Sequence, residues 1–397
     1  MSETKAKGNA VEVFLTFLKL GLTSFGGPVA HLGYYRKELV EQKAWVSESQ
    51  FSQLLAICQF IPGPASSQLG FSLGLLRAGW LGAIAAFIAF TLPSALLLVA
   101  FAYALPSLSG PTGVAAIHGL KLVAFAVVAD AVLGMSKKLC PDNFRRSLAF
   151  LAASTILIIG TAWSQLLVVI LGAVAGMTYC RESTSEFQNH IHVAYSKRFG
   201  FFLLSLFFSL LLLLAFSPQG SGLYPIARAF YNAGAMVFGG GHVVLPLLED
   251  SVVSTGWISS ENFLAGYGAS QAIPGPVFAF SAFLGAIIPT GYSSGLGALT
   301  ALIFMFLPGF LLVAALLPLW QSISHNPIAS NAIAGVNAVV VGILGAALYD
   351  PIFTSGMTSA ADLAIALIAF AMLSVWRLSP LFVVVWCLST TVLLRLI

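Results

Sequence analysis

The chain has 397 residues, of which 58% are hydrophobic and only 8% charged, and its mean hydropathy is +0.95. Soluble domains average about 25% charged residues, so this composition excludes a soluble globular protein and predicts an integral membrane protein. The formal net charge is +4. The first ten residues are polar and lack an apolar core, so we expect no signal peptide.

The apolar segments have the period of helices without a series of alternating strands, which predicts an all-α polytopic membrane protein. Cys58, Cys140, Cys180 and Cys387 are scattered, without CxxC or Cys/His spacing. We interpret them as isolated thiols, and we expect neither a metal site nor another cofactor.

Two groups of glycine and proline interrupt the apolar runs of the first half. The first, FGGP, consists of Phe25, Gly26, Gly27 and Pro28, and the second, IPGP, covers residues 61–64 after Gln59. The apolar arms around them are shorter than the about 20 residues that a full membrane span needs. We therefore expect two broken or re-entrant hairpins, with proline-kinked full spans as the alternative. The arms cover residues 12–25, 28–40, 50–61 and 65–76.

Ordinary transmembrane helices are predicted for the rest of the first half, at about 79–104, 113–136, 147–160 and 163–178. A hydrophilic linker at 181–198 and one very apolar span at 199–216 follow. His190 and His192 lie in the linker, and we interpret them as solvated residues rather than metal ligands.

Both motifs return in the second half. FGGP returns as Phe238, Gly239, Gly240 and Gly241, followed by His242. IPGP returns at residues 273–276 after Gln271, and corresponding positions keep offsets between 212 and 216 residues along the whole half. This pattern predicts two homologous repeats joined by one extra transmembrane helix. The predicted divisions are an N-terminal repeat at 1–180, a linker with the connecting helix at 181–225, and a C-terminal repeat at 226–397.

Loop charge predicts that the second repeat is inverted in the membrane. Of the 18 Lys and Arg residues, only Arg228, Arg377 and Arg395 lie beyond residue 198. The loop at 137–146 carries four basic residues, whereas its counterpart at 349–362 has none. Basic loops stay on the cytoplasmic side, so we expect a cytoplasmic N-terminus and two inverted-topology repeats.

The four breaks predict a binding site for an anion. Inverted repeats with broken helices place substrates near the membrane midplane, and a helix that begins at a break offers free N–H groups and a partial positive charge. Hydroxyl and amide side chains near the breaks add further donors. The predicted substrate-binding residues are Phe25, Gly26, Gly27, Pro28, Gln59, Pro62, Gly63, Pro64, Ser66, Ser67, Gly239, Gly240, Gly241, Gln271, Pro274, Gly275 and Pro276.

Two histidines are predicted to couple proton movement to transport. His31 and His242 each follow a glycine break, and histidine changes charge between pH 5 and 8. The alternative is a histidine that is bonded to the backbone at a helix end.

Four further residues are predicted to act in charge coupling. Lys19 and Lys121 lie in apolar runs, where a charge costs about 3 kcal/mol, so a function is expected. Snorkelling to the interface is the alternative for Lys19. Arg77 is interpreted as an interfacial anchor or an anion contact. Asp130 lies about half a turn from Lys121 around the helix, so the two are not expected to pair.

FGGP followed by a histidine and a charged loop, IPGP after a glutamine, the Leu-Pro of the next helix and the duplication of all three resemble the chromate ion transporter family in its long, two-domain form. The resemblance implies a multi-pass protein of the bacterial inner membrane that exports chromate from the cytoplasm, driven by the proton motive force, and so confers resistance. The family motifs correspond to residues 25–28, 61–64, 238–240 and 273–276. Gly241 stands where the first copy has Pro28, which leaves equal roles for the two halves open.

Chromate follows from the resemblance alone, because sulfate is an isosteric tetrahedral dianion. A transporter or channel for sulfate or another small anion is the alternative. An enzyme is disfavoured, since HExxH, GxSxG and paired aspartates are absent from the predicted helices. The expected partners are a small inorganic oxyanion, protons and membrane lipid, with no nucleic acid, and a homodimer stays open.

Overall fold

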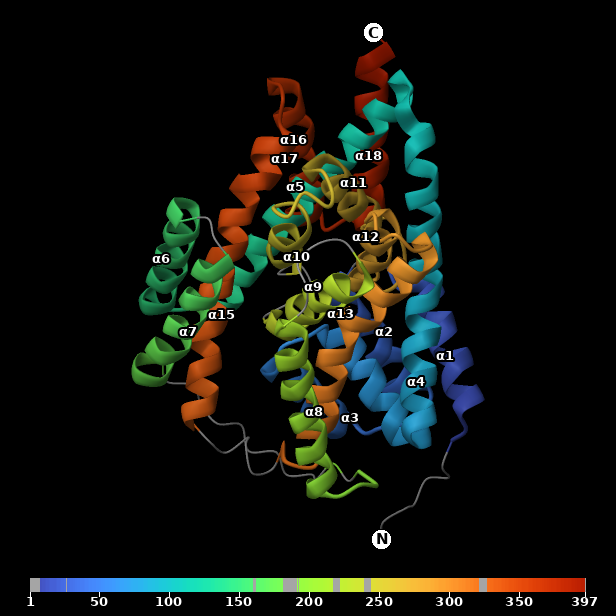
Figure 1. The fold of residues 1–397 in the computed structure, drawn as a ribbon, viewed down its shortest axis with the longest axis vertical. Coiled ribbons are helices and arrows are strands. Elements are labelled where there is room, and N and C mark those ends of the chain that lie inside the picture. The colour runs from blue at the N-terminus through green and yellow to red at the C-terminus, as the bar shows by residue number, and fades with distance from the viewer. Residues whose placement is uncertain are drawn as a thin grey trace.

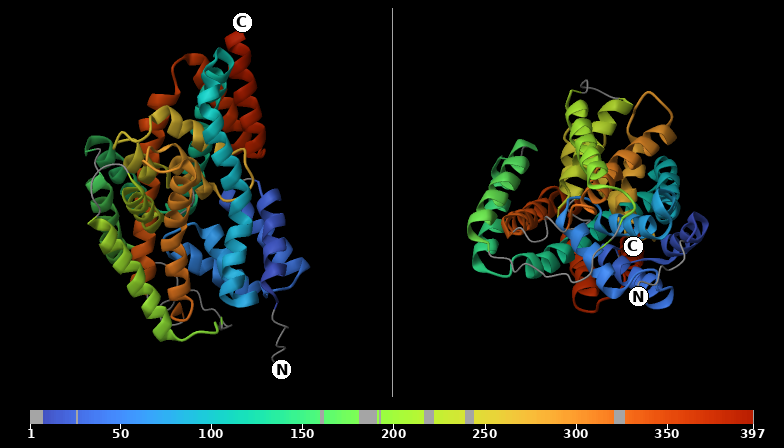
Figure 2. Two further views of the ribbon diagram at one scale, coloured as in Figure 1. Left: turned by 45° about the vertical axis from the view of Figure 1, so that its right-hand side comes forward. Right: turned by 90° about the horizontal axis from the view of Figure 1, so that it is seen from below.

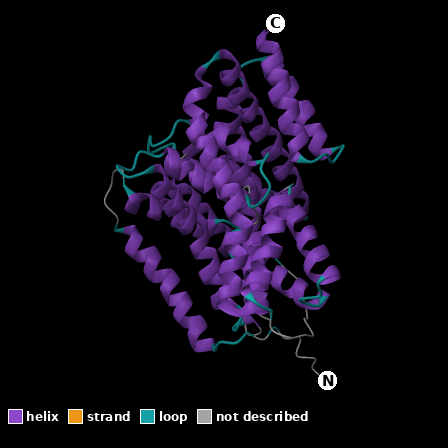
Figure 3. Cartoon of the chain, turned by 90° about the vertical axis from the view of Figure 1, so that its right-hand side faces the viewer, coloured by secondary structure: helices purple, strands orange, loops and turns teal. Residues whose placement is uncertain are grey.

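The computed structural model describes residues 8–25, 27–159, 162–180, 191, 193–216, 222–238, 244–320 and 327–396. These residues form helices and connecting loops without a strand, so the all-α prediction is confirmed (Figure 3). His190 and His192 lie outside the described residues.

The first half and the connecting helix contain α1 (Ala10–Thr23), α2 (Gly27–Tyr35), η1 (Arg36–Gln42), α3 (Glu48–Phe60), α4 (Ala65–Ala104), η2 (Leu105–Ser109), α5 (Pro111–Leu139), α6 (Asn143–Ile159), α7 (Ala162–Tyr179) and α8 (Lys197–Ala215). The second half contains α9 (Leu223–Met236), α10 (Val244–Val252), α11 (Ser260–Ser270), η4 (Val277–Ala279), α12 (Phe280–Ile287), α13 (Ser294–Leu316), α15 (Pro327–Ala347), η5 (Leu348–Phe353), α16 (Thr354–Gly356), α17 (Ala360–Ser374) and α18 (Pro380–Leu396).

Five helices among the described residues are long and apolar enough to cross a membrane. They are Ala65–Leu108, Pro111–Leu139, Lys197–Ala215, Ser294–Leu316 and Ser330–Gly356. Most arms that flank the breaks form helices shorter than a span, namely α1, α2, α3, α9, α10 and α11.

Both hairpins of the first repeat enter and leave on the same side. Glu12, in the first turn of α1, forms an ion pair of 3.1 Å with Arg77, and its carboxylate accepts a hydrogen bond of 3.1 Å from Trp45 Nε1. Trp45 lies in the loop before α3, and Arg77 ends the first segment of α4. The start of α1, the loop between the hairpins and the end of the second hairpin therefore lie together. This arrangement is that of re-entrant hairpins rather than kinked full spans.

Helix α4 consists of two segments that fold back on each other. Its backbone leaves the helical region at Ala78 and Gly79, and the φ of Gly79 is +66°. Gly74 packs directly against the backbone of Gly82 across this turn. The sequence predicts the same division, between the arm that ends at residue 76 and the helix that begins at 79. The longer second segment then crosses the molecule.

The hairpins of the two halves lie toward different ends of the molecule. The hairpins of the first half lie near the N-terminal end of the molecule, whereas α10, α11 and α12 lie toward the opposite end (Figures 1 and 2). The second segment of α4 runs away from the N-terminal end, and α13 runs back toward it (Figure 1). Helix α8 connects the two halves.

Each half covers the long helix of the other. Helices α6 and α7 of the first half pack on α15, while α17 and α18 of the second half pack on α5. Corresponding glycines make these contacts close, because Gly119 of α5 lies against α18 and Gly335 of α15 lies against α7. The same contacts thus occur twice with the roles of the two halves exchanged, which indicates a two-fold relation between the halves.

The predicted inversion is testable by labelling one exposed residue in each inter-hairpin loop. Lys43→Cys and Ser254→Cys are placed singly in a chain whose four native cysteines are replaced. Since basic loops stay inside, an impermeant maleimide is expected to label Ser254→Cys in intact cells, and Lys43→Cys only after permeabilisation. Labelling of both variants from the same side would contradict the inverted arrangement.

Candidate functional site

The four breaks are joined in pairs by backbone hydrogen bonds between the two repeats. The N–H of Gly63 donates to the carbonyl of Val237 at 2.7 Å, and the N–H of Gly275 donates to the carbonyl of Ser24 at 3.0 Å. Ser24 and Val237 are corresponding positions at the ends of α1 and α9, as are Gly63 and Gly275 in the two IPGP motifs. Each IPGP break is therefore bonded to the residue that precedes the FGG motif of the other repeat.

Glycine is required at the centre of each IPGP break. The φ angles of Gly63 and Gly275 are +126° and +103°, a region that residues with a side chain rarely adopt. The space is also occupied, because a Cβ on Gly275 would lie 2.9 Å from Ser94 Oγ and one on Gly63 would lie 3.0 Å from Gly309 Cα. Ser94 and Gly309 directly follow the prolines inside α4 and α13. Each break thus packs on the long helix of the other repeat.

The side chain of Gln68 ties the first IPGP break to α13. Its Nε2 donates to the carbonyl of Pro62 at 2.9 Å and to the carbonyl of Gly309 at 3.0 Å. Its Oε1 and the Oγ of Ser67 are buried and have no hydrogen-bond partner. Ser66 is also buried. Phe280 occupies the position of Gln68 in the second repeat, so this tie is present on one side only.

The other predicted substrate residues are less alike in the two repeats. Gln59 is exposed, whereas Gln271 is buried and donates from Nε2 to Ser270 Oγ at 3.2 Å. Helices α2 and α4 begin at Gly27 and directly after Pro64, as the sequence predicts. Pro28, Pro64 and Pro276 each suit the start of a helix, but Pro276 is followed by the 3₁₀ turn η4, so the expectation of an α-helix directly after it is wrong.

Several predicted residues have a limited structural description. Phe25 is half-buried, Pro62 and Pro274 are partly buried, and Pro64 and Pro276 are buried. The side chain of Pro28 is not described. Gly26, Gly239, Gly240, Gly241 and His242 lie outside the described residues.

Two of the predicted coupling residues are ion-paired at the N-terminal end. Lys19 is 61% exposed and pairs with Glu38 of η1 at 2.8 Å, which neutralises a charge within the apolar α1. Arg77 pairs with Glu12, and its guanidinium lies 5.3 Å from the centre of the Trp45 ring. An arginine that stacks on tryptophan and binds a carboxylate is an interfacial anchor, so this geometry supports the anchor interpretation of Arg77.

Lys121 belongs to a charged cluster that joins α5 to the second repeat. Its Nζ lies 2.8 Å from Glu261 Oε1 at the start of α11, and this bond lowers the pKa of the Glu261 carboxyl. One turn earlier on α5, His118 Nε2 lies 2.8 Å from Asp362 Oδ1 at the start of α17. Asp130 is partly buried and has no ion pair among the described residues. The i, i+3 spacing of His118 and Lys121 is the sequence signal for this cluster, because it places both on one helix face.

An acidic cluster lies near the end of α10, where the chain enters the loop before α11. Burial, together with the neighbouring carboxylates of Asp250 and Asp350, raises the pKa of Glu249 to about 7. Arg36 is the corresponding residue of the first repeat. The sequence analysis does not single out Glu249, because its raised pKa comes from neighbours that the fold brings together.

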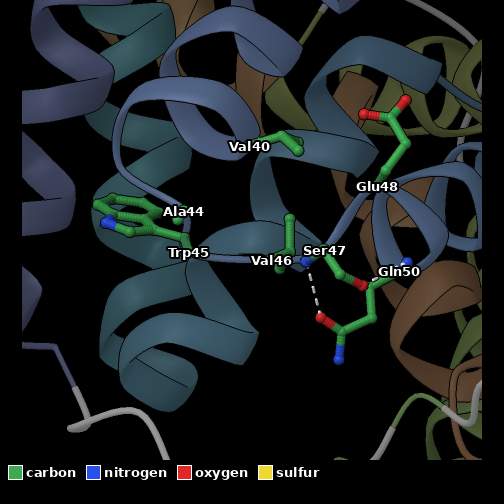
Figure 4. A pocket seen from close by; sticks show the side chains of 7 residues that line it. All are labelled: Val40, Ala44, Trp45, Val46, Ser47, Glu48 and Gln50. Atoms are coloured by element: carbon green, nitrogen blue, oxygen red, sulfur yellow. Dashed lines mark hydrogen bonds between the residues drawn. The ribbon is translucent and has the colours of Figure 1, made fainter.

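An open pocket of about 450 Å³ lies beside the loop before α3 (Figure 4). Its floor includes the N-terminal cap of α3, where Ser47 N–H donates to Gln50 Oε1 at 3.0 Å. The lining residues are Val40, Ala44, Trp45, Val46, Ser47, Glu48 and Gln50. The pocket is thus one helix length from the break at Gly63, and it contains none of the predicted substrate residues.

The two break glycines are expected to be intolerant of side chains. Gly63→Ala and Gly275→Ala are each expected to destabilise the protein by about 1–3 kcal/mol, since alanine at a positive φ is strained. The measurement is thermal unfolding of the purified protein in detergent. Gly33→Ala is the matched control, because α2 leaves open space around that position. Unchanged melting temperatures at Gly63 and Gly275 would refute the close packing of the breaks.

Comparison with known proteins places the chain in one family. The family model described as "Chromate transporter" matches residues 11–177 and 224–392, two regions that fit a duplicated two-domain chain. No solved structure matches the chain.

Curated relatives resemble the chain over most of its length. The "Probable chromate transport protein" of Synechococcus elongatus is 32% identical over 381 residues, which are 93% of this chain and 92% of the relative. The "Chromate transport protein" of Pseudomonas aeruginosa is 28% identical over 85% of this chain and 80% of its own length. The protein of the same name from Cupriavidus metallidurans is 27% identical over 85% of this chain and 81% of its own length. The chain is therefore a membrane protein of the chromate transporter family.

Proposed function

We propose that the chain is a secondary active transporter that exports chromate from the cytoplasm across the bacterial inner membrane, coupled to the proton motive force, and so confers chromate resistance. The observation that carries this proposal is the crossed pair of hydrogen bonds between the breaks, Gly63 to Val237 and Gly275 to Ser24. The names of the relatives supply chromate as the substrate.

The crossed breaks suit an oxyanion for an electrostatic reason. Helix α2 starts at the first break and α4 starts at the second, so free N–H groups and partial positive charge gather inside an apolar protein. No Asp or Glu occurs in residues 20–31, 59–76 or 271–287, so no carboxylate of these segments repels an anion. A binding site near the membrane midplane is the usual use of broken helices in transporters with inverted repeats.

The two ends of the molecule are not equally closed. At one end, α11 lies along α5, Gly268 packs against the backbone of Leu120, and Lys121 binds Glu261. At the other end, α3 has no comparable packing on α15 in the described part of the chain, and the loop before α3 borders an open pocket. In our proposal this is one state of an alternating cycle, open toward the N-terminal side, with Lys121 and Glu261 closing the far side.

Glu249 is the proposed proton carrier. Its pKa of about 7 means that it binds a proton below neutral pH and releases it as the pH rises through 7. Its loop is the counterpart of the basic loop with Arg36, so in the inverted arrangement it faces the outer side, where protons enter. Proton entry there, in exchange for an outgoing anion, is the coupling that export requires.

The function is tested with the purified protein in sealed vesicles. An imposed pH gradient is expected to drive uphill movement of labelled chromate, and a panel of sulfate, molybdate and phosphate competitors measures selectivity. A flux that only equilibrates and ignores the pH gradient would indicate a channel. Transport inhibited better by sulfate than by chromate would indicate the alternative, a sulfate transporter.

Removal of the Glu249 carboxylate is expected to abolish the pH dependence of transport between about pH 6 and 8, because the amide of Glu249→Gln cannot titrate. The measurement is the initial chromate flux at a series of symmetrical pH values, followed by the flux under a pH gradient. Asp142→Asn is the matched control. Hydrogen bonds from Arg145 lower the pKa of Asp142, so that carboxylate stays ionised throughout the range. A normal pH profile in Glu249→Gln would remove this residue from the coupling.

In an alternating cycle, closure of one end of the molecule is expected to exclude closure of the other end. The variant Lys121→Cys/Glu261→Cys marks the contact in this structure, and Asn337→Cys/Ser49→Cys marks the corresponding positions at the other end. A short bifunctional thiol reagent should link either pair in cysteine-free protein in membranes, and each link should stop transport until the reagent is cleaved. If the second pair never links in transporting protein, the alternating arrangement is wrong.

A further inference from the structure

Four fully buried polar side chains of the first repeat have no hydrogen-bond partner. They are Ser24, His31, Tyr35 and Thr91, with exposed fractions of 0%, 0%, 0% and 1%. The unpartnered atoms are Ser24 Oγ, both ring nitrogens of His31, Tyr35 Oη and Thr91 Oγ1. A buried donor without a partner costs about 1–3 kcal/mol. Buried polar groups are otherwise almost always paired, so four in one place need an explanation.

The four residues lie on the segments where the first break meets the second IPGP motif. The rings of His31 and Tyr35, one turn apart on α2, stand edge-on to Phe90 at 5.3 and 5.4 Å. Thr91 follows Phe90 on α4. The backbone of Ser24 interacts with the His31 ring, but not with the geometry of a hydrogen bond. The Ser24 carbonyl accepts a hydrogen bond from the N–H of Gly275. The α carbon of Gly275 packs against the carbonyl of Phe90.

The charged residues near these four side chains would not repel an anion. Every one of the four groups can donate a hydrogen bond. The acidic residues of α1 and η1 nearest in the chain are ion-paired, Glu12 with Arg77 and Glu38 with Lys19. The described parts of α4 and of residues 271–276 contain no acidic residue. The cluster therefore has several donors and no unpaired carboxylate on the elements that form it.

The corresponding junction of the second repeat is apolar. Val237, Val244, Leu248 and Phe306 stand at the positions of Ser24, His31, Tyr35 and Thr91, and all four are buried. The backbone hydrogen bond between the breaks is nevertheless the same at both junctions. The polar side chains are thus not needed to build the junction, since the fold makes it equally well from apolar residues.

We infer that the anion site is one-sided: Ser24, His31, Tyr35 and Thr91 donate hydrogen bonds to a tetrahedral oxyanion at the junction of Ser24 and Gly275, and the apolar junction of the second repeat binds none. This inference rests on the proposed function and gives the site of that function a location and a donor set. Neutral donors held in place by the fold can bind a dianion without a fixed positive charge, because preorganised dipoles replace its water shell.

The test is the affinity of the purified protein for chromate and for sulfate, measured by calorimetry in detergent. Tyr35→Phe and Thr91→Val each remove one hydroxyl and keep the shape. Each is expected to weaken anion binding by about tenfold or more, since a hydrogen bond to a charged group contributes about 1.5–3 kcal/mol. The melting temperature of the anion-free protein is expected to stay the same or rise, because no internal hydrogen bond is lost.

Three controls make the outcome decisive. Thr91→Ser keeps the hydroxyl and should bind nearly normally, and Val244→Ile and Leu248→Met at the apolar junction should bind normally. Unchanged affinity in Tyr35→Phe and Thr91→Val, or equal losses in Thr91→Ser and Thr91→Val, would overturn the inference. If the unaltered protein binds neither chromate nor sulfate, the proposed function fails instead. If the two hydroxyl variants bind normally while transport persists, only the one-sided site is wrong.

Discussion

The structure depends on two backbone hydrogen bonds that exchange the partners of the two repeats, Gly63 to Val237 and Gly275 to Ser24. A broken helix leaves N–H and C=O groups that lipid cannot satisfy, so irregular backbone at membrane depth must find partners within the protein. Here each break finds part of its partners in the opposite repeat. The residues that follow the prolines inside α4 and α13, Ser94 and Gly309, are small, and the opposite IPGP break packs against each of them.

The sequence predicts much of this architecture because its signals are local. Glycine and proline mark the breaks, apolar length separates arms from spans, and nearly constant offsets reveal the repeat. The pairing of the breaks is not predictable in this way, because a repeat shows which residues correspond and not which residues touch. Lys121 illustrates the limit: its position in an apolar run indicates a special role, but its partner Glu261 lies 140 residues away.

The predicted site residues also show what a linear pattern omits. Gln59 and Gln271 are equivalent in sequence, yet one is exposed and the other buried. The sequence does not single out the proposed donors Tyr35 and Thr91, because single hydroxyls in apolar helices are common and usually bond to their own backbone. Their signal is a difference in polarity between the repeats, because the corresponding residues Leu248 and Phe306 are apolar. In a duplicated chain the two repeats can be compared with each other, and positions that differ in polarity are candidates for functional residues.

The interleaving of the halves has a consequence for evolution by duplication. In this fold α6 and α7 cover α15, and α17 and α18 cover α5, so a single repeat would leave its long helix uncovered and the N–H of its IPGP glycine without an acceptor. In the inverted arrangement that loop charge predicts, a chain with one repeat would satisfy these groups only beside a second repeat of opposite orientation. A gene for such a half would therefore have to produce a protein that inserts both ways, or be inherited together with an oppositely oriented sister. Fusion of two copies through one odd helix, as α8 provides here, removes that requirement by fixing both orientations in one chain.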